Sequence, residues 1–77
     1  GKHALYAAKV LLKYKLLEWQ QITMADLTAW AQGTPYFGML HQRHFGDQPE
    51  GEWLLSLVDD LVRSGAAVRQ GEMLHNV

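Results

Sequence analysis

The stretch GTPYFGMLHQRHFGD, residues 33–47, contains many side chains of types that could bind a ligand or a metal, including two of the four histidines and an arginine. His41 and His44 are three residues apart, which on a helix places both rings on the same side. Together with Asp47 or Glu50 they have the residue types of a metal site. A lone histidine pair is a weak signal, however, and the chain has no cysteine to add a thiolate ligand. We therefore expect no metal site, with His44 half-buried and His41 exposed.

The polar side of the same stretch offers contacts for nucleic acid. Gln42 and Arg43 are residue types that pair bidentately with adenine and guanine edges. Thr34, at the expected start of a helix, can hold a phosphate together with the free backbone amides there. Lysines and an arginine elsewhere in the chain would have to neutralise further phosphates. The candidate DNA contacts are Thr34, Tyr36, Gln42, Arg43, Lys9, Lys13 and Arg69.

Catalytic patterns are missing from the sequence. It has no nucleophile beside a base, no glycine-rich phosphate loop after a strand, and no carboxylate pair in a supporting context. We expect no catalytic residue, no cofactor and a non-enzymatic domain. Trp19, Trp30 and Trp53 each fall on an apolar stripe, so we expect them to anchor the core rather than to stack bases.

Length and composition indicate one small globular domain. A chain of 77 residues is near the lower size limit at which an apolar core alone, without disulfides or a bound metal, keeps a domain folded. A hydrophobic content of 48% with 19% charged residues excludes a disordered chain, and the apolar runs are too short to cross a membrane. Because the chain begins with Gly1 and lacks cysteine, we expect a soluble, cytoplasmic domain cut from a larger protein. A DNA-binding domain would instead lie in the nucleoid or nucleus.

Charge is distributed unevenly along the chain. The net charge of −1 gives no general attraction to nucleic acid. Residues 1–17 contain lysines and no acid, whereas residues 47–60 contain acids and no base. The domain should therefore be electrically polar. Solvated faces are the ordinary explanation of such runs, and binding surfaces are the alternative.

A long first helix is predicted for residues 2–20, which lack glycine and proline. One apolar stripe repeats at helical spacing, and it consists of Leu5, Ala8, Leu12, Leu16 and Trp19. A second apolar sector lies on the opposite side and consists of Tyr6, Val10, Tyr14 and Leu17. A helix with two apolar sides is either enclosed on both or shows one of them to a partner. The sequence leaves these two possibilities open.

Three shorter helices and a hairpin are predicted to follow. Thr23 can cap a helix over residues 24–32, with Asp26 bonding back to it, and Gly33 can end that helix in the left-handed conformation. Residues 35–45 form the next helix, which stops at Gly46. A cap by Asp47 with Glu50 opens the fourth helix, which runs to Ser64–Gly65. Residues 66–77 then predict two strands around Gln70–Gly71, with Arg69 and Glu72 facing each other across the turn.

This order of elements resembles the winged helix-turn-helix superfamily. The similarity is carried by the helix start TMADL and by LVDDLVRSGAAV, in which a helix runs through a glycine into a strand. It implies a mainly α, winged-helix-like bundle of about four helices with a C-terminal β-hairpin, in a single domain over residues 1–77. The helix at residues 35–45 is additional to the plain winged-helix pattern. Two helices are therefore candidates for the recognition helix.

Charge separates these two candidates. The helix that precedes the hairpin has an acidic polar face, which DNA phosphates would repel. The helix at residues 35–45 is therefore the expected recognition helix. The first hypothesis is that the chain is a duplex-DNA-binding module of a regulatory or DNA-processing protein. The alternative is a protein–protein interaction module, or homodimerisation module, that does not contact DNA. Its candidate contacts are Tyr6, Val10, Tyr14, Leu17, Glu52, Asp59 and Asp60.

Overall fold

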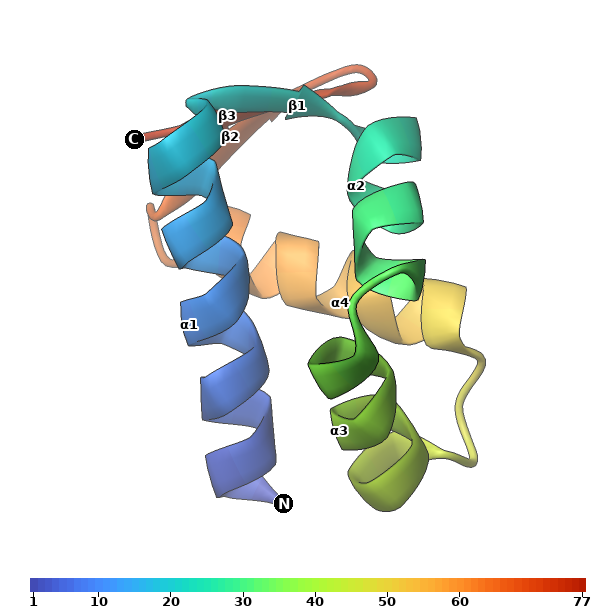
Figure 1. Cartoon of the computed structure of the whole chain (residues 1–77). Coiled ribbons are helices and arrows are strands. Elements are labelled where there is room, and N and C mark those ends of the chain that lie inside the picture. Colours follow the sequence, from blue (N-terminus) through green and yellow to red (C-terminus); the bar gives the residue numbers. More distant parts are fainter.

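The structure, a computed structural model, describes all 77 residues and contains four helices and three strands. The predicted mainly α fold with a C-terminal hairpin is confirmed. In Figure 1, α1 lies on one side, α2 and α3 lie on the other, α4 crosses behind them, and the strands close one end. In chain order the elements are α1 (Lys2–Trp19), β1 (Gln21–Thr23), α2 (Met24–Gln32), α3 (Pro35–Phe45), α4 (Glu50–Arg63), β2 (Ala67–Gln70) and β3 (Met73–Asn76).

The sheet has one strand more than the sequence predicted. Its order is β1-β3-β2 with both pairs antiparallel, so β3 is central. β1 has only three residues, too few to show an alternating pattern, and it exists because Ile22 lies opposite Leu74 on β3. The hairpin turns at Gly71, whose positive φ of 59° suits a tight turn. The predicted turn at Gln70–Gly71 is wrong by one residue: Gln70 pairs with Met73, so the turn consists of Gly71 and Glu72. Arg69 therefore lies opposite Leu74 rather than Glu72, although its guanidinium still reaches Glu72 at 3.8 Å.

Gln20 forms the corner between α1 and the sheet. Its φ is 71°, the left-handed conformation that ends helices, and its amide donates to the Leu16 carbonyl. Its side-chain amide donates to the Leu17 carbonyl at 2.7 Å, and its own carbonyl accepts from the Asn76 amide at 2.8 Å. The helix therefore ends one residue earlier than predicted, and the corner is bonded directly to the last strand.

Both ends of α2 agree with the sequence in their positions, but their geometry differs in part from the prediction. The Thr23 hydroxyl accepts from the Asp26 amide at 3.0 Å, as predicted, but the Asp26 carboxylate makes no bond in return. The left-handed conformation predicted for Gly33 is wrong, since its φ is −86°. Its amide donates to Ala29, and the Thr34 amide donates to Ala31. These bonds tighten the last turn, so a left-handed residue is unnecessary.

The predicted cap of α4 by Asp47 is also wrong. Pro49 is the N-cap residue, and its carbonyl accepts from the Trp53 amide at 3.0 Å. Asp47 lies exposed in the preceding loop, and no side chain makes a capping hydrogen bond to the first turn. The fixed φ of proline starts the helix here, at Glu50, in place of a side-chain cap.

The core consists of 16 buried residues, all of them apolar. α1 contributes one residue every four positions, namely Ala4, Ala8, Leu12 and Leu16. Leu5 and Trp19, predicted on this stripe, pack beside it and are only half-buried. The two alanines let α1 lie close to its neighbours, since they add almost no side-chain bulk.

A chain of aromatic rings connects all four helices. Trp19 of α1 meets Trp30 of α2 edge-on, with ring centroids 5.3 Å apart. Trp30 lies 5.6 Å from Phe37 of α3, and Phe37 lies 5.0 Å from Trp53 of α4. Trp53 is 1% exposed, whereas Trp19 and Trp30 are half-buried. The tryptophans thus act as packing anchors, as expected.

The N-cap of α2 gives a test of this local structure. We expect Thr23→Ala to lower the free energy of unfolding by about 1 kcal/mol, because it removes a helix-end hydrogen bond. Asp26→Ala should cost less, since its carboxylate contributes only through the helix dipole. Chemical denaturation of both variants measures the difference, and equal stability of Thr23→Ala and the unchanged protein would contradict it.

Candidate functional site

The histidine pair of α3 is placed opposite to expectation. His41 is half-buried, lies 5.4 Å from the Trp53 ring, and bonds through Nε2 to the Gln48 carbonyl at 2.6 Å. His44 is exposed. The prediction that His44 is the half-buried one is wrong because the loop before α4 folds back over His41. No three histidine, aspartate or glutamate side chains lie close enough together to hold a metal ion.

The serine and threonine hydroxyls serve the backbone. Thr28 donates to the Met24 carbonyl at 2.9 Å, and Ser56 donates to Trp53 at 2.7 Å. Ser64 likewise bonds within its own helix end. Each of these three hydroxyls is thus paired with a main-chain oxygen of its own helix.

The α3 candidates for DNA contact are only partly available. Tyr36 is 48% exposed, and Gln42 and Arg43 are exposed and bonded to no other group. The Thr34 hydroxyl donates to the Trp30 carbonyl at 2.7 Å and is therefore directed toward α2. Arg43 is the one fixed positive charge on this helix.

The basic residues expected to support α3 are engaged within the domain. The Lys13 ammonium donates to the Ala66 carbonyl at 2.7 Å, to the Asn76 side chain at 2.6 Å and to the Val77 oxygen at 3.2 Å. An ammonium has three donors, so all are occupied. Lys9 pairs with Asp60 of α4 at 3.0 Å.

Arg69 of the hairpin is engaged as well. Its Nε donates to the Gly71 carbonyl at 3.0 Å, and its guanidinium faces Glu72. The structure therefore does not gather these basic groups with Arg43 into one surface that is free for phosphates.

The second apolar sector of α1 is open to solvent. Tyr6 and Tyr14 are 70% and 67% exposed, Leu17 is 48% exposed, and Val10 is half-buried between them. They line a shallow groove of about 410 Å³, which we name the α1 groove. Its residues are Tyr6, Lys9, Val10, Lys13, Tyr14, Leu17 and Leu61. Of the two possibilities that the sequence left open, the structure shows the one in which α1 presents an uncovered apolar side.

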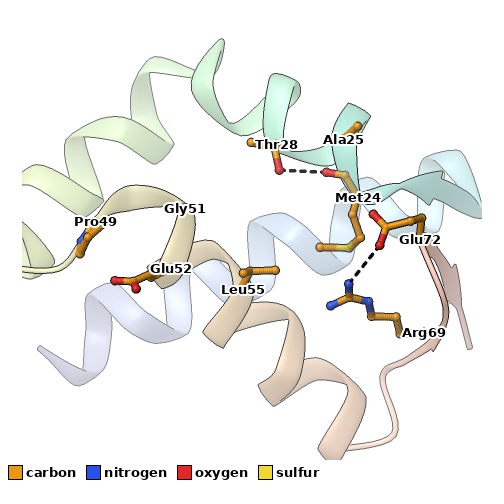
Figure 2. A pocket seen from close by; sticks show the side chains of 9 residues that line it. All are labelled: Met24, Ala25, Thr28, Pro49, Gly51, Glu52, Leu55, Arg69 and Glu72. Atoms are coloured by element: carbon orange, nitrogen blue, oxygen red, sulfur yellow. Dashed lines mark hydrogen bonds and ion pairs between the residues drawn. The ribbon is translucent and has the colours of Figure 1, made fainter.

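A second groove lies between α2, the start of α4 and the hairpin, and we name it the hairpin groove (Figure 2). Figure 2 shows Met24 and Leu55 in its middle, the Arg69 and Glu72 pair at the hairpin end, and Glu52 and Pro49 at the other. Its volume is about 640 Å³. The nine lining residues are Met24, Ala25, Thr28, Pro49, Gly51, Glu52, Leu55, Arg69 and Glu72.

The predicted acidic contacts differ in availability. Asp60 is held by Lys9 and by Arg63, whose guanidinium lies 2.6 Å from it. The hydrogen bond from Lys9, followed by that from Arg63, lowers the pKa of Asp60. Glu52 and Asp59 are exposed and make no ion pair, and Glu52 lies in the hairpin groove.

Sequence reasoning did not find the hairpin groove. Its apolar centre combines Met24, 5% exposed, with Leu55, 45% exposed, and these residues belong to different helices. Leu55 carried one weak signal, because it falls outside the stripe that α4 buries. Nothing local indicated that Arg69 and Glu72 of the hairpin would lie beside it.

Compared with known proteins, the chain matches no family model, no curated protein and no solved structure. None of the helices combines the length and the apolar character needed to cross a bilayer.

The Lys9–Asp60–Arg63 cluster gives a pH-dependent prediction. Because the folded-state pKa of Asp60 is lowered, its stabilisation is present above the ordinary aspartate pKa of about 3.9 and is lost as the pH falls through the folded value. We expect Asp60→Asn to cost about 0.5–1 kcal/mol at neutral pH, the range of partly exposed ion pairs.

Urea denaturation of both proteins, near pH 7 and below the folded-state pKa, measures this difference. The matched control is Asp59→Asn, which removes an exposed carboxylate without a partner and should change little. A cost of Asp60→Asn that stays constant across both conditions would contradict the assignment.

Proposed function

We propose that this domain is a non-enzymatic, winged-helix-like protein-interaction module that binds its partner through the α1 groove. The observation that carries the proposal is the uncovered apolar side of α1. We infer a partner surface that is apolar at its centre and carries carboxylates at its edge.

The exposed side chains are of the kind that supplies binding energy. Tyr6 and Tyr14 are large, rigid side chains, and tyrosine is enriched at the energetic centres of protein interfaces. Single exposed apolar residues need no explanation, whereas a contiguous set of them rimmed by polar groups marks an interaction site. Here Lys9 and Lys13 form the polar rim.

The sign of the charge along this rim specifies the partner. All three donors of Lys13 are occupied within the domain, so Lys13 is not free to bind a carboxylate of the partner. Lys2, on the same edge of the helix, is exposed and unpaired. Lys9 is paired with Asp60, so Lys2 supplies the free positive charge on this edge. Carboxylates on the partner would therefore be attracted to this edge.

Resemblance to winged helix-turn-helix domains also favours a protein partner. By this resemblance, α4, which runs into the hairpin, would correspond to the recognition helix. Its exposed face carries Glu52 and Asp59, which would repel phosphates. The duplex-DNA hypothesis is the second candidate, and it rests on Arg43, exposed on α3 beside Tyr36 and Gln42.

Peptide binding tests the first candidate. The probe is a fluorescent amphipathic helix with a leucine stripe flanked by glutamates, and its control has lysines in place of the glutamates. We expect the acidic probe to bind more tightly than the basic one, and Tyr14→Glu to weaken binding at least about tenfold, as removal of an interface anchor does.

The matched control variant is Gln42→Glu, which makes the same charge change at an exposed site outside both grooves. Circular dichroism verifies that both variants are folded. Equal binding of the two probes, equal binding by Tyr14→Glu, or no binding of the acidic probe up to about 1 mM would overturn the proposal.

Titration with mixed-sequence duplex DNA at low salt tests the second candidate. We expect no binding at about 100 μM, because the supporting basic groups are engaged and α4 is acidic. Binding that weakens steeply with salt and is reduced by Arg43→Ala but not by Tyr14→Glu would establish the DNA hypothesis instead.

A further inference from the structure

We propose that the partner of the α1 groove is a helix that lies along α1 and carries two carboxylates two helical turns apart, one bound by Lys2 and the other by Arg63 of α4. This inference rests on the proposed function, because it names the groups that select the partner at the same site. Arg63 lies outside the lining of the groove, so the binding surface extends from α1 onto α4.

The Arg63 guanidinium is an available cation. Its side chain is 76% exposed, and its one hydrogen bond joins Nη2 to the Asp60 carboxylate at 2.6 Å. A guanidinium has five N–H donors, so most of them are free for a ligand. These donors bind the two oxygens of a carboxylate in pairs. Arg63 can therefore hold a carboxylate of the partner while it keeps its bond to Asp60.

Asp60 holds Arg63 beside the α1 groove. One Asp60 oxygen accepts from Arg63, and the other lies 3.0 Å from the ammonium of Lys9, which lines the groove. The hydrogen bond from Lys9, followed by that from Arg63, lowers the pKa of Asp60, so the carboxylate stays charged at neutral pH. Lys9 is committed to this pair, whereas Arg63 remains open to solvent.

Lys2 is the second available cation. It is exposed and takes part in no ion pair. Lys2 and Lys9 are seven positions apart in α1, which corresponds to two turns, or about 10 Å along the helix axis. Because Asp60 links Arg63 to Lys9, the two available cations are separated by about two turns as well.

The apolar side of α1 determines the direction of a bound helix. Four side chains follow one another there at three- and four-residue spacing, namely Tyr6, Val10, Tyr14 and Leu17. A stripe of this kind packs against the apolar stripe of a helix that runs at a shallow angle to it. One flank of the partner then follows the edge of α1 that carries Lys2 and Lys9. Carboxylates at positions i and i+7 on that flank would meet Lys2 and Arg63.

Asp59 lies on the same face of α4 as Arg63, four positions before it. It is exposed and makes no ion pair with Arg63. A solvated carboxylate at this place weakens the attraction for an acidic partner but does not occupy the guanidinium. We therefore expect Asp59→Asn to strengthen the binding of an acidic helix slightly.

Peptides that differ only in the spacing of their charges test the inference. The probe is a fluorescent helix with a leucine stripe and two glutamates two turns apart on one flank. Its comparison peptide has the same composition, with the two glutamates one turn apart. Measured by fluorescence anisotropy at low salt, the first should bind about two- to fivefold more tightly, the range of one exposed ion pair.

Three matched variants assign this preference to residues. Lys2→Gln and Arg63→Gln should each remove it, because only one of the two cations then remains. The control is Arg43→Gln, which makes the same charge change at an exposed site on α3, outside both grooves, and should retain the preference. Circular dichroism verifies that each variant is folded.

Three results would overturn this inference. They are equal binding of the two peptides, an unchanged preference in Arg63→Gln, and an equal loss of preference in Arg43→Gln. If Tyr14→Glu still weakens binding in these cases, and acidic helices still bind more tightly than basic ones, the assignment of Lys2 and Arg63 fails and the proposed function stands. If neither peptide binds, both fail together.

Discussion

Trp53 is the side chain on which the packing of the helices converges. Its ring lies 5.0 Å from Phe37, 5.3 Å from Phe45 and 5.4 Å from His41, so one residue of α4 holds most of the inner side of α3. Through Phe37 it connects to Trp30 and so to α2 and α1. Trp53 is 1% exposed, and its large ring stabilises the domain through these apolar contacts. In a chain of this length, few other residues are available to share that role.

This arrangement has a consequence for the surface of the molecule. α1 meets the core through a narrow stripe that begins with Ala4 and Ala8, and the remaining elements are all engaged on that inner side or at the helix end. No element is left to cover Tyr6, Tyr14 and Leu17. The open side of α1 thus follows from the small number of elements rather than from any local irregularity.

Local signals in the sequence predicted those features that depend on neighbouring residues. The Thr23 cap, the end of α3 before Gly46 and the hairpin were of this kind, since turn and cap chemistry acts over a few positions. β1 was missed because its pairing with β3 joins Ile22 to Leu74, about fifty residues away.

Local signals were likewise insufficient to predict how the site residues are placed. The α1 sector was visible as a pattern, but whether it was covered depended on the whole fold. The engagement of Lys13 by Ala66 and Asn76 had no local sign at all, nor did the folding of the Gln48 loop over His41. Both are contacts between segments whose positions only the tertiary structure determines.

The contacts of Lys13 and Gln20 with the last strand bear on how the chain acquires its structure. Lys13 and Asn76 are separated by 63 positions, and the Gln20 carbonyl accepts from Asn76 as well. Contacts between segments so far apart in the sequence form late in folding, because the intervening chain must first be ordered. During synthesis, α1 can form early as a helix, but it cannot be fixed in place until residues 73–76 have left the ribosome. The domain should therefore be completed in one cooperative step that joins its first helix to its last strand.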